Sequence, residues 1–193
     1  MFAVLIIKTN VMKISTKQML AILLGISWVI FVGVCIEAGG FICNAFFTLV
    51  LNPVGARHFW QEVNLSNLYW YNHGCFFAET LLICIVAVMR AYLFYLIIKI
   101  LHNKKLDMLQ PFNPEVERFI LNISRVSLLI GLVSWIGATY TFWLVKQGVA
   151  MPDLQHLRLA GADVWLFMGV TLFVIGQIFK RGVEIQTEND LTI

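Results

Sequence analysis

The sequence predicts an all-α membrane protein in which four spanning helices form one bundle. Of its 193 residues, 60% are hydrophobic and only 13% are charged, against about 25% charged residues in soluble domains. Four apolar segments reach or approach the length of about 20 residues that a spanning helix needs. Basic residues gather at one side of these segments and are scarce at the other. We therefore expect one membrane domain over residues 1–193.

The apolar segments place the four helices at about residues 19–38, 76–98, 119–145 and 159–179. The last segment reaches spanning length only if residues 159–162 are included. After the first segment, EAGGFICNAFFTLVLNPVG stays apolar beyond a pair of glycines, which fits either a kinked extension of the helix or an interfacial helix. Aromatic residues at 58–60 and 68–71 then predict an outer cap at headgroup depth.

The start of the chain allows two interpretations. MFAVLIIKTNVMK lacks both a basic region before its apolar run and a small-residue cleavage site, which argues against a signal peptide. A second methionine, Met12, begins the more ordinary MKISTKQML. The true start is therefore Met1, with a loose extension, or Met12.

The distribution of basic residues predicts the orientation of the chain. One side has only Arg57, Lys146 and Arg158, and the other has Lys13, Lys17, Lys99, Lys104, Lys105, Arg118, Lys180 and Arg181. Because basic residues favour the cytoplasmic side, both termini are expected there, and residues 180–193 form a short cytoplasmic tail. The net charge of +3 is explained by these residues and by contacts with anionic lipid, without a nucleic-acid partner.

The connections between the helices carry readable local patterns. Asn113 is placed to cap the third helix, and Pro114 suits its first position. Glu115 and Glu117 favour the positive end of the helix dipole. In the loop between the third and fourth helices, Pro152 predicts a turn, and LQHLRLAGA fits an interfacial helix.

The four cysteines, Cys35, Cys43, Cys75 and Cys84, show no metal-ligand spacing. Cys43 and Cys75 both fall near the outer surface, where a disulfide is chemically feasible, and the spacing leaves this alternative open. We expect no metal site and no cofactor. Catalytic motifs such as HExxH, GxSxG and a phosphate-binding glycine loop are also missing from the sequence, so we do not expect an enzyme.

Ionisable residues within or beside the apolar segments are candidates for a polar site, because charge is costly in the bilayer. They are Glu37, Glu79, Arg90, Arg125 and Asp163. In one interpretation, the three acidic residues line an outer pocket for a cation, a proton or a small amine, together with His73 and His156. In the other, Asp163 caps the fourth helix, the glutamates lie in the headgroups and the arginines extend to the cytoplasmic interface.

Arg90 lies farthest from either interface in this scheme, so it needs a partner or water. Asn122 and Ser124 of the third helix are the candidates.

The closing segment is unlike the rest of the chain. Gly182 suits a helix C-cap, and VEIQTE alternates apolar and polar residues as a strand would. Such a tail binds a partner as an added strand or through its acidic residues, or else it is disordered or folded against its own cytoplasmic loop.

Several segments together resemble the family known as domain of unknown function 2975. They are CIEAGGF, LSNLYWYN, FYLIIKI with QPFNPEVERFI, ADVWLF and, most specifically, IFKRGVEIQTENDLTI. The resemblance implies a small bacterial four-helix protein of the inner membrane. It also implies a gene commonly found beside one for a small helix-turn-helix regulator, and therefore a regulatory partnership.

The leading functional hypothesis is a non-enzymatic sensor that binds such a regulator in the cytoplasm. The expected partner-binding residues are Lys104, Lys105, Glu184, Glu188, Asp190 and Ile193. The alternative is a small transporter or permeability-modifying protein that uses the five ionisable residues of the apolar segments. Either hypothesis allows homo-oligomers in the bilayer.

Overall fold

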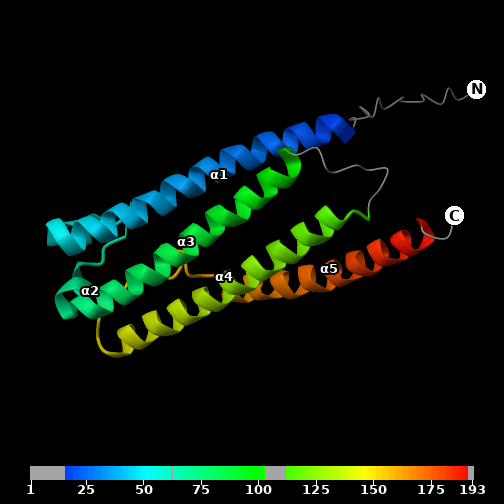
Figure 1. Ribbon diagram of the computed structural model, residues 1–193. Coiled ribbons are helices and arrows are strands. Elements are labelled where there is room, and N and C mark those ends of the chain that lie inside the picture. Colours follow the sequence, from blue (N-terminus) through cyan, green and yellow to red (C-terminus); the bar gives the residue numbers. More distant parts are fainter. Residues whose placement is uncertain (1–15, 62, 103–111, 191–193) are drawn as a thin grey trace, which may run out of the picture.

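The computed structural model describes residues 16–61, 63–102 and 112–190. Four long helices dominate it, and each is long and apolar enough to cross a membrane. They are α1 (Thr16–Phe46), α3 (His73–His102), α4 (Pro114–Lys146) and α5 (Ala162–Asp190). No strand occurs within these described ranges, so the predicted all-α fold class with four spanning helices is confirmed. The first residue of α1 and the last of α5 lie at the same end of the molecule (Figure 1).

The long helices pack in chain order. α1 packs on α3, α3 packs on α4, and the contact between α4 and α5 is the most extensive. In the described part of the chain, α1 makes no extensive contact with α4 or α5. Most of α1 therefore presents apolar side chains outward, among them Ile22, Val29 and Ile36, as expected for a helix that faces lipid.

α1 is longer than the first apolar segment suggested. It continues through Gly39 and Gly40 to Phe46, and a π-helical turn, η1 (Phe47–Leu51), follows it directly. A Cβ atom at Gly40 would lie 1.8 Å from the Trp60 ring. This glycine therefore allows the indole to pack against the helix, which continues without an interfacial break.

The segment after α1 folds into a compact cap. It contains the 3-10 helix η2 (Pro53–His58), a single β-bridge between Trp60 and Val63, and the short helix α2 (Ser66–Tyr71). Phe59 is fully buried, and its ring centroid lies 6.1 Å from that of Phe41 and 6.0 Å from that of Phe76. Phe59 of the predicted aromatic cluster thus packs with Phe41 of α1 and Phe76 of α3 in the core of the cap.

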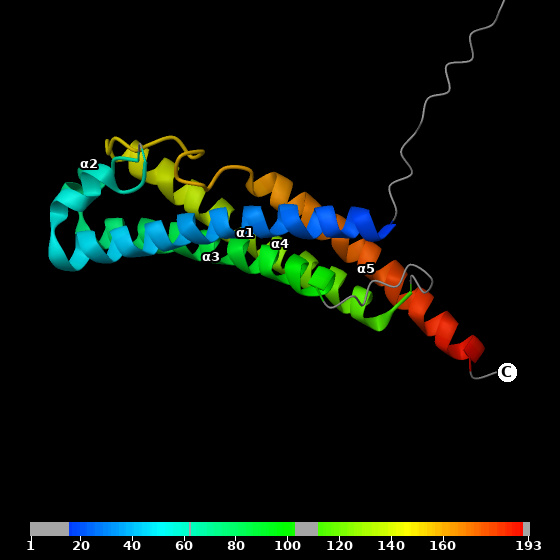
Figure 2. The same cartoon turned by 90° about the horizontal axis from the view of Figure 1, so that it is seen from above.

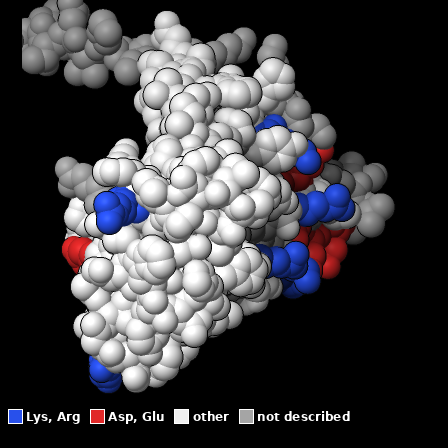
Figure 3. Space-filling view, turned by 90° about the vertical axis from the view of Figure 1, so that its left-hand side faces the viewer, with Lys and Arg blue, Asp and Glu red and all other residues white. Residues whose placement is uncertain are grey.

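Other aromatic side chains of the cap face outward. Trp70 has 72% of its surface exposed, and Tyr71 is also exposed. From the cap end, the molecule presents a broad uncharged surface with charged groups toward its margins (Figure 3). Of the aromatic residues that the sequence places at headgroup depth, these exposed ones are the candidates for that position.

The beginning of α4 confirms the predicted capping pattern. The Asn113 side chain accepts a hydrogen bond from the Glu115 amide at 2.9 Å, and Pro114 occupies the first turn. Because α4 begins at this cap, its start precedes the predicted apolar segment over residues 119–145.

Close packing fixes α5 along α4. Three glycines each face a leucine of the other helix: Gly131 faces Leu166, Gly169 faces Leu128, and Gly176 faces Leu121. A Cβ atom at these glycines would lie 2.7, 2.7 and 2.6 Å from the leucine side chains, respectively. The Ser124 hydroxyl also donates to the Gly169 carbonyl at 2.8 Å. Small residues allow membrane helices to approach closely, and we call this contact the glycine–leucine seam.

The seam places the start of α5 near the middle of α4, because Leu166 lies against Gly131. The connection over residues 147–161, which we call the inserted loop, therefore runs back from the cap end along the helices (Figure 2). Leu157 and Leu159 in this loop are fully buried. The loop consists of turns and irregular backbone, so the predicted interfacial helix over LQHLRLAGA is wrong.

α5 continues past Gly182 to Asp190, so the predicted C-cap at Gly182 is wrong, and so are the strand and the disordered tail over residues 183–190. A Cβ atom at Gly182 would lie 2.3 Å from the Phe112 ring, which gives this glycine a packing role. Arg181 and Glu184 form an ion pair of 3.0 Å one helical turn apart. Such pairs and the good helix formers Glu and Gln favour a helix over the strand.

Candidate functional site

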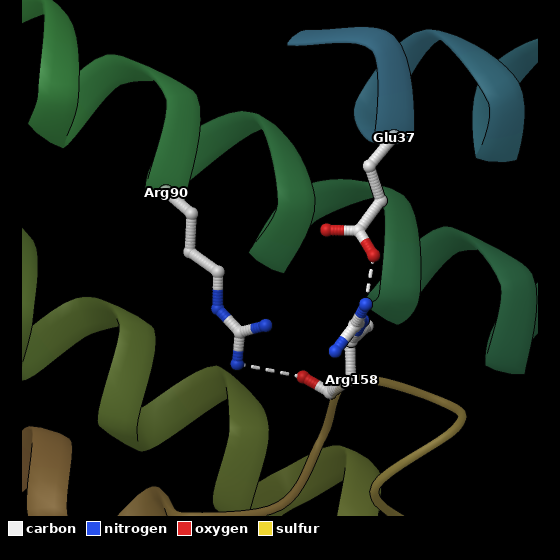
Figure 4. A network of polar contacts seen from close by, with 3 residues as sticks. All are labelled: Glu37, Arg90 and Arg158. Carbon is white, nitrogen blue, oxygen red and sulfur yellow. Dashed lines mark hydrogen bonds and ion pairs between the residues drawn. The ribbon is translucent and has the colours of Figure 1, made fainter. Parts of the chain in front are cut away.

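The candidate site is a polar network that joins three parts of the chain. The Arg158 Nε atom in the inserted loop donates to Glu37 Oε1 of α1 at 2.5 Å. The Arg90 Nη2 atom of α3 donates to the Arg158 carbonyl oxygen at 2.7 Å. Figure 4 shows Arg158 between the two helices, with its side chain directed to Glu37 and its carbonyl to Arg90.

Arg90 extends the network to α5. Its guanidinium carbon lies 5.6 Å from the ring centroid of Trp165, in the first turn of that helix. The prediction that Asn122 or Ser124 is the partner of Arg90 is wrong. Arg90 donates to the inserted loop instead, and the Ser124 hydroxyl donates to Gly169. Arg90 therefore stays within the protein, and the prediction that it extends to the cytoplasmic interface is wrong.

Two acidic residues lie at positions along the helices that differ from those the sequence predicted. Glu37 falls within the apolar span Gln18–Leu51, 19 residues after its start and 14 before its end. The predicted helix ended at Ala38, which placed Glu37 at the boundary. Asp163 lies in the first turn of α5, which begins near the middle of α4. Asp163 and Arg125 of α4 are both exposed, and neither joins the network.

A cavity of about 440 Å³, which we call the cap cavity, opens beside the network. Its lining residues come from the cap and the inserted loop: Trp60, Gln61, Val63, Gln155, His156 and Arg158. The predicted outer pocket shares only His156 with it. Glu37 does not line this cavity but bonds Arg158, which does. Glu79, Asp163 and His73 do not line it either.

Backbone strain is concentrated at the cap cavity. Gln61 and Arg158 adopt left-handed conformations, with φ of 48° and 60°. They are the only non-glycine residues with positive φ in the described ranges, and both line the cavity. Such conformations cost of order 1–3 kcal/mol each and cluster at functional sites.

Glu79 forms a separate polar contact between α3 and α4. It is fully buried, and its Oε1 atom accepts a hydrogen bond of 2.6 Å from the Thr141 hydroxyl. Its Oε2 atom is buried with no hydrogen-bond partner. The prediction that Glu79 lies in the headgroups is therefore wrong.

Sequence reasoning missed the central residue of the network. The sequence indicates Arg158 only as an outer-side charge, whereas it stands between two fully buried leucines, Leu157 and Leu159. The tripeptide LRL is the available signal, because apolar residues on both sides of the arginine indicate a segment that packs against the protein. Trp60 was likewise assigned to the membrane surface, but it packs on Gly40 and lines the cavity.

The remaining site expectations concern cysteines and partner-binding residues. All four cysteines are free, so the structure does not contain the disulfide between Cys43 and Cys75. The described residues contain no group of three or more His, Cys, Asp or Glu that could hold a metal ion. Glu184 and Glu188 lie on α5, whereas Lys104, Lys105, Ile193 and the Asp190 side chain lie outside the described residues.

These features define a small polytopic membrane protein with a polar network within its apolar helices. The chain belongs to the family described as protein of unknown function (DUF2975), whose profile matches residues 7–193. Neither the curated proteins nor the solved structures include a match.

Proposed function

We propose that this protein is a sensor of the bacterial inner membrane that binds a cytoplasmic partner through the end of α5. One observation carries the proposal: α5 is a single helix from Ala162, four residues after Arg158, to Asp190. One end of this helix thus adjoins the polar network, and its other end carries the charged segment that the sequence predicted to be a partner-binding tail.

The coupling depends on the inserted loop. Glu37 and Arg90 both hold Arg158, which is directly connected to the start of α5. The glycine–leucine seam holds α5 tightly against α4, so the two helices would move together as one unit relative to α1. A change at Arg158 would therefore reach the far end of α5 as a displacement of a stiff helix, one of the ways in which proteins transmit binding events.

The far end of α5 offers a surface for a partner. Glu184 and Glu188 are exposed there, and Ile185 has 45% of its surface exposed. A small helix-turn-helix regulator is the partner that the family resemblance implies, and the basic surface of a DNA-binding protein would complement these glutamates. Lys104, Lys105, Asp190 and Ile193 complete the proposed binding set.

Partner capture tests this function. The full-length protein and a version that ends at Gly182 are purified in mild detergent, and bound proteins are identified by mass spectrometry. We expect a small DNA-binding protein to be recovered with the full-length chain and not with the shortened one. An Ile185→Pro variant retains the charges but breaks the helix, so it should also lose the partner. Identical sets of bound proteins from all three chains would contradict the proposal.

Transport is a second candidate, favoured by the cap cavity and by the polar network within the span. In this alternative, Glu37, Arg90 and Arg158 continue a polar path inward from the cavity, with Glu79, Arg125 and Asp163 as further charges. Proteoliposomes with an entrapped pH-sensitive dye would report proton flux. Arg90→Gln and Glu79→Gln should abolish it, while the exposed cap residue Arg57 provides the control Arg57→Gln. Flux that is unchanged in the first two variants would exclude this mechanism.

A further inference from the structure

We propose that the cap cavity binds a small oxyanion, a carboxylate or a phosphate group, which competes with Glu37 for Arg158. This inference rests on the proposed sensor function, because it names the chemical class that the sensor detects. It is drawn from the hydrogen-bonding groups around the cavity, their charge and the local backbone conformation.

Arg158 offers the principal binding group. Glu37 contacts only its Nε atom, so the two terminal amino groups have no acceptor among the described residues. The Arg158 side chain is 47% exposed, and the residue lines the cavity. Because guanidinium groups bind carboxylates and phosphates with two parallel hydrogen bonds, Arg158 is suited to hold an oxyanion while it turns away from Glu37.

The other walls supply further donors. The Trp60 ring lines the cavity, whereas its indole N–H is buried away from open space and has no acceptor among the described residues, which is unusual for a buried donor. Gln61 and Gln155 contribute amides, and His156 contributes an imidazole. No described lining residue is acidic. The described lining residues therefore combine donors with one positive charge, that of Arg158, which favours an anion over a cation.

The surrounding charges and backbone support the same class of ligand. Arg90, which bonds the Arg158 carbonyl, adds a second positive charge from α3. The two residues with left-handed backbone, Gln61 and Arg158, face the cavity from opposite segments of the chain. Strained residues of this kind persist only where the surrounding structure holds them in place, as expected at a site organised before its ligand arrives.

The cavity volume limits the size of the ligand. About 440 Å³ lies within the usual range of about 300–1,000 Å³ for small-molecule sites. The Trp60 ring and Val63 add apolar surface to the donors. A compact carboxylate with an aromatic or aliphatic part would therefore use more of the site than a bare phosphate ion.

Ligand binding would break the link between α1 and the inserted loop. An oxyanion on Arg158 replaces the Glu37 carboxylate, which is only 18% exposed and lies within the apolar span. The loop would keep its bond to Arg90 and its buried leucines, but it would lose its polar link to α1, so the start of α5 could shift relative to α1. The ligand thus changes the position of the element that carries the proposed partner-binding surface.

Calorimetric titration of the purified full-length protein in a non-ionic detergent tests the site, with benzoate and inorganic phosphate as probes. We expect benzoate to bind, and phosphate to bind more weakly. Arg158→Gln should weaken benzoate binding at least tenfold. Arg57→Gln removes a charge from the cap outside the cavity and should leave binding unchanged.

The Glu37→Gln variant separates competition from a structural role. It removes the competing carboxylate, so benzoate should bind severalfold more tightly, a gain that simple damage to the fold would not produce. Absence of benzoate and phosphate binding in both the wild type and Glu37→Gln would overturn the proposal, as would equal binding by the wild type and Arg158→Gln. Because no partner is present, these results are independent of the partner-capture experiment.

A second arm distinguishes a free solute from a lipid headgroup. The titration is repeated in nanodiscs of phosphatidylcholine with and without phosphatidylglycerol. Benzoate binding that persists in both nanodiscs indicates a free carboxylate as the ligand. Binding in detergent that is lost in the nanodiscs indicates that a lipid phosphate occupies the same oxyanion site.

Discussion

The Arg158 Nε atom lies 2.5 Å from Glu37 Oε1, and this contact joins residues 121 positions apart in the chain. It connects the first long helix to the loop that precedes the last one. Because α1 otherwise packs mainly on α3 and the cap, this ion pair is its direct polar link to the second half of the protein. This polar link between the two halves is therefore a contact between partly exposed side chains.

We predict measurable coupling between these two residues. Glu37→Gln, Arg158→Gln and the double variant form a thermodynamic cycle, to be followed by denaturant unfolding in detergent. We expect an interaction free energy of about 1 kcal/mol, since partial exposure weakens an ion pair. Strictly additive effects of the two substitutions would show that the contact contributes nothing to stability.

The sequence predicted the fold class and the cap at Asn113 because both depend on local composition and spacing. It misplaced Glu37 because the apolar sequence after Ala38 gives no indication of where α1 ends. It misplaced Asp163 for another reason: the position of α5 along α4 is set by the glycine–leucine seam, between residues far apart in the chain. The apolar pattern of one segment carries no information on the position of α5 along α4.

The seam leads to a second prediction. Gly169→Ala would place a Cβ atom 2.7 Å from the Leu128 side chain and 2.9 Å from its backbone nitrogen. Because backbone cannot move aside easily, we expect a loss of about 1–3 kcal/mol in unfolding free energy. Gly25→Ala in α1, where no atom lies within 4 Å, is the matched control and should be neutral or slightly stabilising. Equal effects of the two substitutions would argue against close packing at the seam.

A third prediction concerns the buried carboxyl group of Glu79. Thr141→Val removes its hydrogen-bond donor and leaves both carboxyl oxygens without a partner. We expect a loss of about 1–3 kcal/mol in unfolding free energy, measured by thermal or denaturant unfolding in detergent. Thr139→Val is the control, because Thr139 is exposed and bonds only the Trp135 carbonyl of its own helix. If both variants unfold alike, the contact between Glu79 and Thr141 does not stabilise the helix pair.

The same contact explains why Glu79 was difficult to place from sequence. A glutamate six residues into a helix fits a headgroup position as well as a buried one. Only the packing of α3 on α4 brings Thr141 to Glu79, and the two residues are 62 positions apart. Arg158 presents the same difficulty, since its partner and its cavity both come from distant segments.

The fourth prediction is the orientation of the protein in the membrane. The excess of basic residues at the end where α1 begins and α5 finishes predicts that this end is cytoplasmic. A fluorescent protein that matures only in the cytoplasm, fused after residue 193, should therefore fluoresce, whereas alkaline phosphatase at the same position should be inactive. Fusions after Ala150, in the inserted loop, should give the opposite pair of results. The reverse pattern would place the cap cavity in the cytoplasm and would exclude a partner-binding role for α5 on that side.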